Sequence, residues 1–356
     1  MDILKIVCYN LFKGNSNNEM RSKKMKKYPL FSEMKKGDKV SRPFYITDIQ
    51  ENKAKNGSSF VKITMKDEKD SRTANMFDTD LKKLNEMDIS ANCIAAVSLD
   101  VGEYNNFPSY TVRDIKPNDD NDITIKDFIT LPPIDCDLMF NTMITLLEDS
   151  APSESEYTPI SKLAITLLKR YEEDFKTSSA AISMHHNLRG GLLYHSYRMM
   201  LAADALSKVY TILDRELLLS GAALHDIGKM YEYNTTAMGD ASMSVHGALF
   251  GHLFIGAEMV MNEKKKDNYD ADKVNVLAHM ICSHHSKQEW GAIKPPATAE
   301  AHALYFIDDL DAKMYSCEKF YEDLAPGKMT EKRPFGFDNN FYRPKFTAEA
   351  LNESDT

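Results

Sequence analysis

One apolar stretch that ends in a charged pair limits what the surrounding chain can fold into. The run from Leu217 to Leu224 is typical of a buried helix, and it leads directly into His225 and Asp226. An unpaired charge in a protein core costs several kcal/mol. Imidazole and carboxylate are ordinary ligands for Zn, Mn, Fe or Co, so a divalent metal would satisfy both groups. Lys229 follows one turn later, where it would either meet an anion or interact with the helix dipole.

Histidine is confined to one part of the chain, because all ten histidines lie between His185 and His302. A histidine-dependent site therefore belongs to a single domain. The candidate ligands lie near the ends of four or five predicted helices, which would bring them together only in a compact bundle. A single histidine is more often a hydrogen-bonded residue, and we interpret His246, His279 and His302 in that way. We predict that a metal site is built from His195, His225, Asp226, His252, His284, His285 and Asp308.

The composition predicts a protein with a large core and no membrane span. The 356 residues, 43% of them hydrophobic, suffice for two or three domains. The apolar runs stay short of the roughly 20 residues that cross a bilayer. The start of the chain lacks the features of a secretion signal. The five scattered cysteines, with no Cys-x-x-Cys, indicate reduced thiols, so we expect a cytoplasmic protein.

The net charge of −9 is distributed unevenly along the chain. Residues 1–66 carry 15 Lys/Arg and 6 Asp/Glu, whereas the remainder is strongly acidic. This asymmetry suggests that the front end of the chain meets a polyanion, although the first 27 residues alone are better explained as a solvated basic tail. We expect residues 1–36 to form a basic, weakly structured extension, in which Met25 could be an alternative start.

Residues 37–117 carry the signals of β-strands. An Asn56-Gly57 pair is a strong hairpin cue. Strands are predicted over Val40–Ile49, Phe60–Lys66, Ser71–Phe77, Cys93–Val101 and Tyr110–Ile115, with a helix near Leu81–Met87. Five short strands with a helix between the third and fourth fit an OB-fold barrel.

One face of the second predicted strand suits nucleic acid. Alternation directs Val61, Ile63 and Met65 to one side and the residues between them to the other. Bases can stack on aromatic rings while phosphates meet lysines, and each stacked base contributes about 1–3 kcal/mol. We predict that single-stranded nucleic acid is bound by Phe60, Lys62, Lys66 and Phe77, with Tyr104, Phe107 and Tyr110 as further candidates. The alternative is that these aromatic rings close the ends of the barrel.

The rest of the chain is predicted to be helical. Residues 118–158 are expected to form a linker with one helix, from Asp135 to Glu148. From Pro159 onward we predict helices that start near Leu192, end at His225-Asp226, open at Gly251-His252, and span Val274–Ser283 and Thr298–Phe320. We therefore expect a multidomain α and β protein, in which a five-stranded barrel precedes an all-α bundle over 159–322 and a tail over 323–356.

Several motifs resemble a known family. The pattern His…His-Asp…Asp is similar to that of the HD-domain phosphohydrolases. The match narrows with His185-His186-x-x-x-Gly190-Gly191, Leu224-His225-Asp226-Ile227-Gly228-Lys229, Ser283-His284-His285 with Trp290-Gly291, Lys294-Pro295-Pro296 and Ile307-Asp308-Asp309. With the barrel, these motifs resemble the YhaM-type 3′–5′ exoribonucleases of Gram-positive bacteria and their phages, over roughly Gly37 to Pro344. The first 36 residues lie outside the match, and Phe77 stands where we expect a tryptophan.

The resemblance implies a metal-dependent 3′–5′ exonuclease that acts on single-stranded RNA, or also on DNA. It implies two divalent ions, with Mn²⁺ foremost and Co²⁺, Fe²⁺, Ni²⁺ or Zn²⁺ as alternatives. Lys229 would neutralise a phosphate oxygen, His186 would contact substrate, and Asp311 would either orient a ligand or pair with a lysine. The first ion would be held by His195, His225, Asp226 and Asp308, and Asp226 would bridge to a second ion held by His252, His284 and His285.

Two other functions are compatible with these residues. One is an HD hydrolase that acts on a small nucleotide, such as a dNTP, a cyclic dinucleotide or an alarmone. The other is a nucleic-acid-binding adaptor with a structural metal site, although the complete ligand set argues against it. The sequence leaves open the identity of the metal, the preference for RNA or DNA, and the oligomeric state, a homo-oligomer included.

Overall fold

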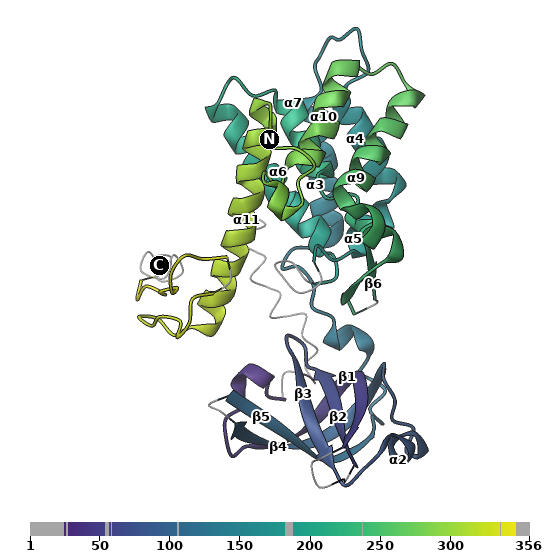
Figure 1. Cartoon of the computed structure of the whole chain (residues 1–356), viewed down its shortest axis with the longest axis vertical. Coiled ribbons are helices and arrows are strands. Elements are labelled where there is room, and N and C mark those ends of the chain that lie inside the picture. Colours follow the sequence, from purple (N-terminus) through teal and green to yellow (C-terminus); the bar gives the residue numbers. More distant parts are fainter. Residues whose placement is uncertain are drawn as a thin grey trace. The chain divides into compact units, whose positions relative to one another are not determined.

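Five β-strands close into a barrel in the first of two structural units, Met1–Pro133 (Figure 1). The second unit, Ile134–Thr356, is built mainly of helices. The structure is a computed structural model that describes residues 25, 28–53, 57, 59–104, 107–181, 188–236, 238–334 and 336–346. Among these residues, no helix has the length and apolar character needed to cross a membrane.

The strand order of the barrel is β1-β2-β3-β5-β4. All neighbouring pairs are antiparallel except β3 and β5, which are parallel. A short helix, α2 (Leu81–Glu86), separates the third strand from the fourth. The strands are β1 (Lys39–Lys53), β2 (Ser59–Lys66), β3 (Ser71–Phe77), β4 (Cys93–Tyr104) and β5 (Phe107–Pro117). This closed five-stranded arrangement confirms the OB-like barrel that the sequence predicted.

Alternation along β2 builds the barrel core. Val61, Ile63 and Met65 are fully buried, and Lys62 between them is exposed. Because side chains of a strand alternate between its two faces, a shift of one residue would expose all three apolar side chains. At the start of this hairpin Gly57 has φ 85°, a left-handed conformation that favours glycine, whereas Asn56 lies outside the described residues.

The barrel unit begins before the predicted boundary at residue 37. A 3₁₀ turn, η3 (Phe31–Glu33), buries Phe31, whose ring stacks on Phe44 with centroids 4.9 Å apart. The backbone N–H of Phe31 donates to the Asp67 carboxylate at 2.6 Å, and Arg42 donates to the Pro29 carbonyl at 2.6 Å. Residues 28–36 therefore differ from the weakly structured extension that we expected, because their apolar side chains complete the barrel core.

The predicted linker over 118–158 is divided between the two units. Its first part carries η4 (Ile125–Phe128), and Phe128 is buried next to Tyr45. Its second part carries α3 (Cys136–Ser150), which buries Met139, Phe140, Met143, Ile144, Leu146 and Leu147 in the helical unit. The structural boundary therefore falls at Pro133, and the predicted linker helix is part of the helical core.

Nearly every helix of the second unit contributes buried side chains to its core. The side chains of Asp214 and Thr298 cap the first turns of α7 and α11 by accepting backbone N–H bonds. After α3 come α4 (Ile160–Arg170), α5 (Glu172–Thr177), α6 (Gly191–Val209), α7 (Arg215–Leu224), α8 (Lys229–Glu232), α9 (Val245–Glu263), η5 (Lys264–Lys266), α10 (Ala271–Ser283), η6 (Gln288–Trp290) and α11 (Ala299–Asp323).

Two features differ from the predicted run of helices. A hairpin of β6 (Tyr233–Thr235) and β7 (Ala241–Met243) lies between α8 and α9, where the sequence predicted no strand. Strands of three residues are too short to show a period in the sequence. The helical segment over residues 245–250 was not predicted; it ends at a break at Gly251, with φ 70° and ψ 153°, where the predicted helix then begins within α9.

The end of the chain folds back onto α11. The rings of Phe337 and Phe341 lie 5.5 and 4.9 Å from that of Phe320, and Arg343 donates to the Leu324 carbonyl at 2.8 Å. Residues 324–334 and 336–346 thus pack against this helix rather than forming a separate tail.

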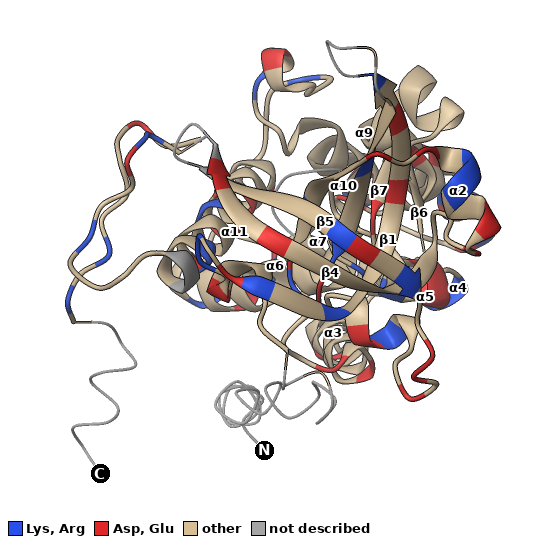
Figure 2. Ribbon diagram, turned by 90° about the horizontal axis from the view of Figure 1, so that it is seen from below, with Lys and Arg blue, Asp and Glu red and all other residues tan. Residues whose placement is uncertain are grey.

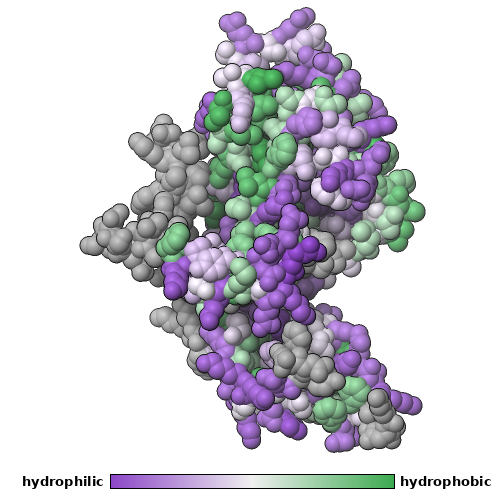
Figure 3. Space-filling model, turned by 60° about the vertical axis from the view of Figure 1, so that its left-hand side comes forward, coloured by the Kyte–Doolittle hydropathy of each residue, from purple (hydrophilic) through white to green (hydrophobic). Residues whose placement is uncertain are grey.

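Large apolar side chains also reach the surface of the helical unit (Figure 3). Among them are Leu249 on α9 and Phe306 on α11.

Candidate metal centre and nucleic-acid face

Most of the predicted ligands in the helical unit lie near the end of a helix or next to a break in one, and the packing of these helices brings them together. His195 lies in the first turns of α6, and Asp308 lies on α11. His225 and Asp226 follow the last residue of α7, His252 follows the break in α9, and His284 and His285 follow α10. A Cβ on Gly228 would lie 2.2 Å from the carbonyl oxygen of His252, so a glycine is required where α8 approaches α9.

The first group of ligands surrounds the ring of His195. Its Nε2 lies 3.2 Å from Nε2 of His225 and 3.2 Å from Oδ1 of Asp308. Oδ2 of Asp226 lies 3.2 Å from Nε2 of His225. His195, His225 and Asp226 are buried, and their ligand atoms all lie within 4.8 Å of one another. These distances suit a shared cation.

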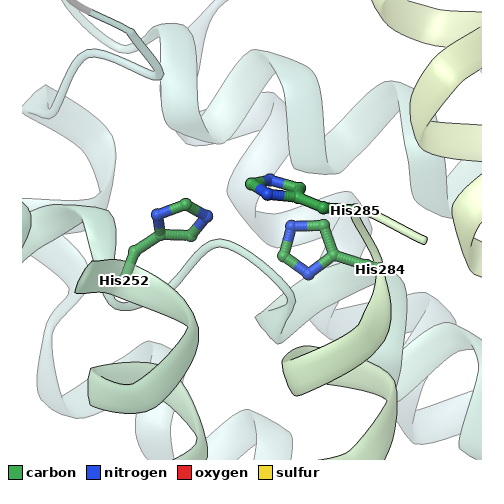
Figure 4. Close-up of side chains that lie close together, drawn as sticks. All are labelled: His252, His284 and His285. Carbon is green, nitrogen blue, oxygen red and sulfur yellow. The ribbon is translucent and has the colours of Figure 1, made fainter. Parts of the chain in front are cut away.

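The second group consists of His252, His284 and His285, whose ligand atoms also lie within 4.8 Å of one another. The three rings converge on one point from two different segments (Figure 4). His252 and His284 are buried, whereas His285 is only half-buried. His285 is therefore the ligand closest to solvent in this group.

Asp226 joins the two groups. Its Oδ2 faces the first group, while its Oδ1 lies 3.4 Å from Nε2 of His252 and 3.6 Å from Nε2 of His284. Oδ1 of Asp226 and Nε2 of His252 are both buried, and neither has a hydrogen-bond partner among the described residues. Buried polar atoms are nearly always paired, so these two fit atoms that coordinate a cation.

In each of these five histidine rings, the nitrogen that points away from the cluster, Nδ1, faces an oxygen atom. Nδ1 of each histidine lies 2.7–3.1 Å from an oxygen that can only accept. Each Nδ1 therefore carries a hydrogen, and each Nε2 is turned toward the cluster, which is the arrangement of metal-binding histidines. The acceptors of His195, His225, His284 and His285 are Asp311, the Ala222 carbonyl, the Ile281 carbonyl and the Trp290 carbonyl, and Nδ1 of His252 faces Oε2 of Glu232 in an ion pair.

The pKa values of His195 and His285, one histidine from each group, move in opposite directions. Burial alone would lower the pKa of His195, but hydrogen bonds to Asp308 and Asp311 outweigh it and raise this pKa to about 9. Burial, reinforced by the nearby His284, lowers the pKa of His285 to about 4. Burial also raises the pKa of Asp226, but the Lys229 ammonium and His225 hold it well below its usual range. Asp226 is thus an anion that a cation can bind.

Lys229 contacts the candidate centre directly. Its Nζ lies 2.7 Å from Oδ2 of Asp226, and the residue is buried. It is the first residue of the one-turn helix α8, and its ammonium group points to the Asp226 carboxylate. The ammonium group belongs to the site, where it meets the one carboxylate that both groups share.

Two carboxylates contact the Nδ1 atoms of clustered histidines, on the side away from the cluster. Asp311 accepts from His195 and lies 2.6 Å from Nε of Arg198, so it pairs with an arginine rather than a lysine. Glu232 lies 2.9 Å from Nδ1 of His252 and also accepts from the His252 backbone N–H. The sequence analysis missed Glu232, because nothing in its spacing or neighbours distinguishes it from a surface glutamate.

His246, His279 and His302 lie apart from this cluster. His246 is exposed, with its ring tilted against that of Phe250 at 5.0 Å between centroids, and His302 is exposed on α11. Nε2 of His279 accepts from the Ala297 backbone N–H at 2.9 Å. His186, a predicted substrate contact, lies outside the described residues, as does His185.

The predicted nucleic-acid face of the barrel is only partly assembled. Phe60 and Phe77 are paired across β2 and β3 with ring centroids 5.8 Å apart, and Phe77 is 52% exposed. Lys62 is exposed, but Lys66 at the end of β2 is buried, so it does not lie on an exposed face as the prediction required. Tyr110 is also buried, against Phe31. The side chains of Tyr104 and Phe107 lie outside the described part.

The barrel itself carries no excess positive charge. Residues 28–117 contain 14 Lys/Arg and 14 Asp/Glu, and both signs are interspersed along the strands (Figure 2). The positive excess over residues 28–66 is therefore cancelled by acidic residues later in the barrel sequence, and the excess before residue 28 falls on residues outside the described part. Binding of nucleic acid to this face would therefore depend more on base stacking than on electrostatic attraction by lysine and arginine side chains.

Comparisons with known proteins identify the family of this chain. The HD domain family model matches residues 192–313, which include the seven predicted ligands. The chain is 33% identical over 312 residues to the 3′-5′ exoribonuclease YhaM of Bacillus velezensis, and 32% identical over 312 residues to that of Bacillus subtilis. Both alignments cover 87% of this chain and 96% of the relative.

One solved structure also aligns with part of the chain. It is the mitochondrial single-stranded DNA-binding protein Rim1 of S. cerevisiae, which covers 23% of this chain and 99% of its own. The identity is 16% and the TM-score is 0.20, so the barrel assignment rests on its strand order instead. The extent and identity of the two Bacillus alignments show that this chain belongs to the YhaM family of 3′–5′ exoribonucleases.

Proposed function

We propose that this protein is an exonuclease that removes nucleotides from the 3′ end of single-stranded RNA. The observation that carries the proposal is the Asp226 carboxylate, whose two oxygens face two separate groups of histidines. Family membership supports the activity and its direction, because the curated relatives are named 3′-5′ exoribonucleases.

The HD domain implies dependence on a divalent metal. We infer that two ions are held, the first by His195, His225, Asp226 and Asp308, and the second by Asp226, His252, His284 and His285. Mn²⁺ suits a set of imidazoles and carboxylates, and Co²⁺, Fe²⁺, Ni²⁺ and Zn²⁺ are alternatives. When bound, such ions supply Lewis acidity that activates water and polarises a phosphoryl oxygen.

Other side chains of the protein would neutralise charge, orient the metal ligands and exclude water. Lys229 lies against Asp226, so its ammonium is placed to neutralise a phosphate oxygen as negative charge builds up. Asp311 and Glu232 hold the rings of His195 and His252 in the orientation that binding requires. Burial of His195, His225, His252 and His284 keeps bulk water away from the reacting phosphate.

The exposed ring of Phe77, beside the half-buried ring of Phe60, would capture the single strand by stacking. We expect Phe77→Ala to raise the KM for a 20-nucleotide RNA about ten-fold, while the KM for a dinucleotide stays unchanged, because a dinucleotide is too short to need the barrel. Phe346→Ala removes another exposed phenylalanine ring elsewhere and serves as the control. Equal effects on both substrates would contradict capture by the barrel.

The decisive experiment is digestion of single strands labelled at the 5′ or the 3′ end, with each divalent metal in turn. Attack from the 3′ end releases a 3′ label at once as a mononucleotide, whereas a 5′-labelled strand shortens gradually. Immediate loss of the 5′ label would reverse the proposed direction. Hydrolysis of dNTPs, cyclic dinucleotides or alarmones without release of mononucleotides from RNA would replace the exonuclease by a small-nucleotide hydrolase.

A further inference from the structure

Trp290, the only tryptophan of the chain, is 51% exposed. Tryptophan is usually well buried, and its large flat ring is enriched where proteins bind other molecules. The ring of Trp290 belongs to η6, in the loop between α10 and α11. An exposed indole in such a place requires a reason other than packing.

The loop holds this ring in a fixed position. The backbone N–H of Gly291 donates to the Gln288 carbonyl at 2.9 Å, that of Ala292 to the Lys287 carbonyl at 3.1 Å, and that of Ile293 to the Cys282 carbonyl at 3.0 Å. The last bond ties the end of the loop back to α10. Trp290 is therefore presented to solvent by a closed set of backbone bonds.

The same loop is attached to the metal centre. Nδ1 of His285 donates to the Trp290 carbonyl at 2.9 Å, so the backbone of Trp290 sets the orientation of a candidate ligand. His285 is the half-buried member of its group, whereas His252 and His284 are buried. Trp290 is thus linked to the one histidine on the solvent side of the centre, where a strand must enter.

A cation lies over the exposed ring. Nζ of Lys287 is 4.3 Å from the centroid of the Trp290 indole, and the Lys287 side chain is 54% exposed. A cation–π contact at such an exposed site is weak enough for a ligand to displace. An indole face beside an ammonium group offers one partner for a base and one for a phosphate, which together match a nucleotide.

We infer that Trp290 stacks on the base of the nucleotide being removed, and that Lys287 contacts the adjoining phosphate. This inference rests on the proposed exonuclease function and adds the site that holds the scissile end of the strand. The backbone carbonyl of Trp290 orients His285 whatever its side chain is, so replacing the ring separates stacking from metal binding.

Fluorescence of the full-length protein tests this directly, since Trp290 is the only indole. In the presence of the metal that supports digestion, adenosine 5′-monophosphate should quench the emission in a saturable manner. Ribose 5-phosphate at the same concentration, which lacks a base, should not. Equal quenching by both compounds, or no quenching by either, would overturn the inference without the use of any variant.

Kinetics on RNA supply the second test. Trp290→Ala should raise KM about ten-fold with little change in kcat, Trp290→Phe should restore most of the loss, and Gln288→Ala in the same loop should match wild type. Metal content should be the same in all of them. A fall in kcat or metal content with unchanged KM would assign Trp290 a structural role only. Failure of the wild type to digest RNA would instead refute the proposed function.

Discussion

Oδ1 of Asp226 lies 3.4 Å from Nε2 of His252, and neither buried atom has a hydrogen-bond partner among the described residues. The other oxygen of the same carboxylate faces His225. One carboxylate therefore joins two groups of histidines that come from different helices. Any change that moves His252 relative to Asp226 should affect the second group and spare the first.

Asp311→Asn should weaken metal binding about 10–100-fold, because Asp311 orients His195 through Nδ1 at 2.7 Å and does not itself face the cluster. Isothermal titration of the metal-free protein with Mn²⁺ measures this affinity. Glu318→Gln is the matched control, since Glu318 pairs with the same arginine, Arg198, but is 54% exposed. Equal affinities for the Asp311 variant and wild type would refute the orienting role.

Gly228→Ala should destabilise the protein by about 1–3 kcal/mol and reduce metal content, because the new Cβ would lie 2.2 Å from the His252 carbonyl oxygen. The φ of Gly228 is −64°, so alanine is acceptable to the backbone and only the contact matters. Ala223→Gly, in the preceding helix, removes a buried methyl without touching His252 and should leave metal content unchanged. Full metal content in Gly228→Ala would show that the close approach does not position His252.

The ion pair of Arg170 and Glu263 should make stability depend on acid pH. Arg170 donates to both carboxylate oxygens at 2.6 and 3.0 Å, and together with Lys266 it lowers the pKa of Glu263 to about 2. A carboxyl whose folded pKa is depressed stabilises the fold above its unfolded pKa, near 4.5, and this contribution disappears as pH falls toward 2.

Glu263→Gln should therefore lower the free energy of unfolding by about 2 kcal/mol at pH 7, and the difference from wild type should shrink between pH 4.5 and pH 2. Urea unfolding at several pH values measures it. Lys162→Ala breaks the exposed pair with Asp267 and should cost much less. A difference that stays constant with pH would contradict the assignment to this ion pair.

Asp67→Asn should loosen the segment before the barrel. The buried carboxylate of Asp67 accepts from the backbone N–H groups of Phe31, Lys69 and Asp70 at 2.6–2.7 Å, and the amide would replace one acceptor by a donor. We expect a loss of about 2 kcal/mol and faster amide exchange at Phe31. Asp70→Asn alters a half-buried neighbour whose side chain does not contact Phe31, and it is the control. Unchanged exchange at Phe31 would show that the carboxylate does not fix this segment.

Local patterns were sufficient to predict most of the barrel and the residue types of the centre. The period of two along β2 fixes which side chains are buried, and the ends of apolar helices mark His225 and His284 as unusual. The histidine groups were predictable because each ligand is conspicuous where it occurs in the chain. Their arrangement around Asp226 required the helices to pack, and only the structure gives these distances.

Contacts between distant residues of ordinary appearance could not be predicted. Glu232 meets His252 20 positions later in the chain, and the Trp290 carbonyl meets His285 across a turn. In sequence, Lys66 continues the alternation of β2 and was expected to be exposed. In the structure it is buried at the end of the strand. Phe31 was assigned to a polar extension, because the basic residues before it outweighed its apolar side chain.

Elemental analysis of the purified protein tests the central claim most directly. Wild type should hold two divalent ions per chain, His252→Ala should hold about one, and His246→Ala, on the same helix but exposed, should hold two. Asp226→Ala should lose both ions, since its carboxylate faces both groups. A wild-type content of one ion, or a His252→Ala content equal to that of wild type, would contradict the bridged pair.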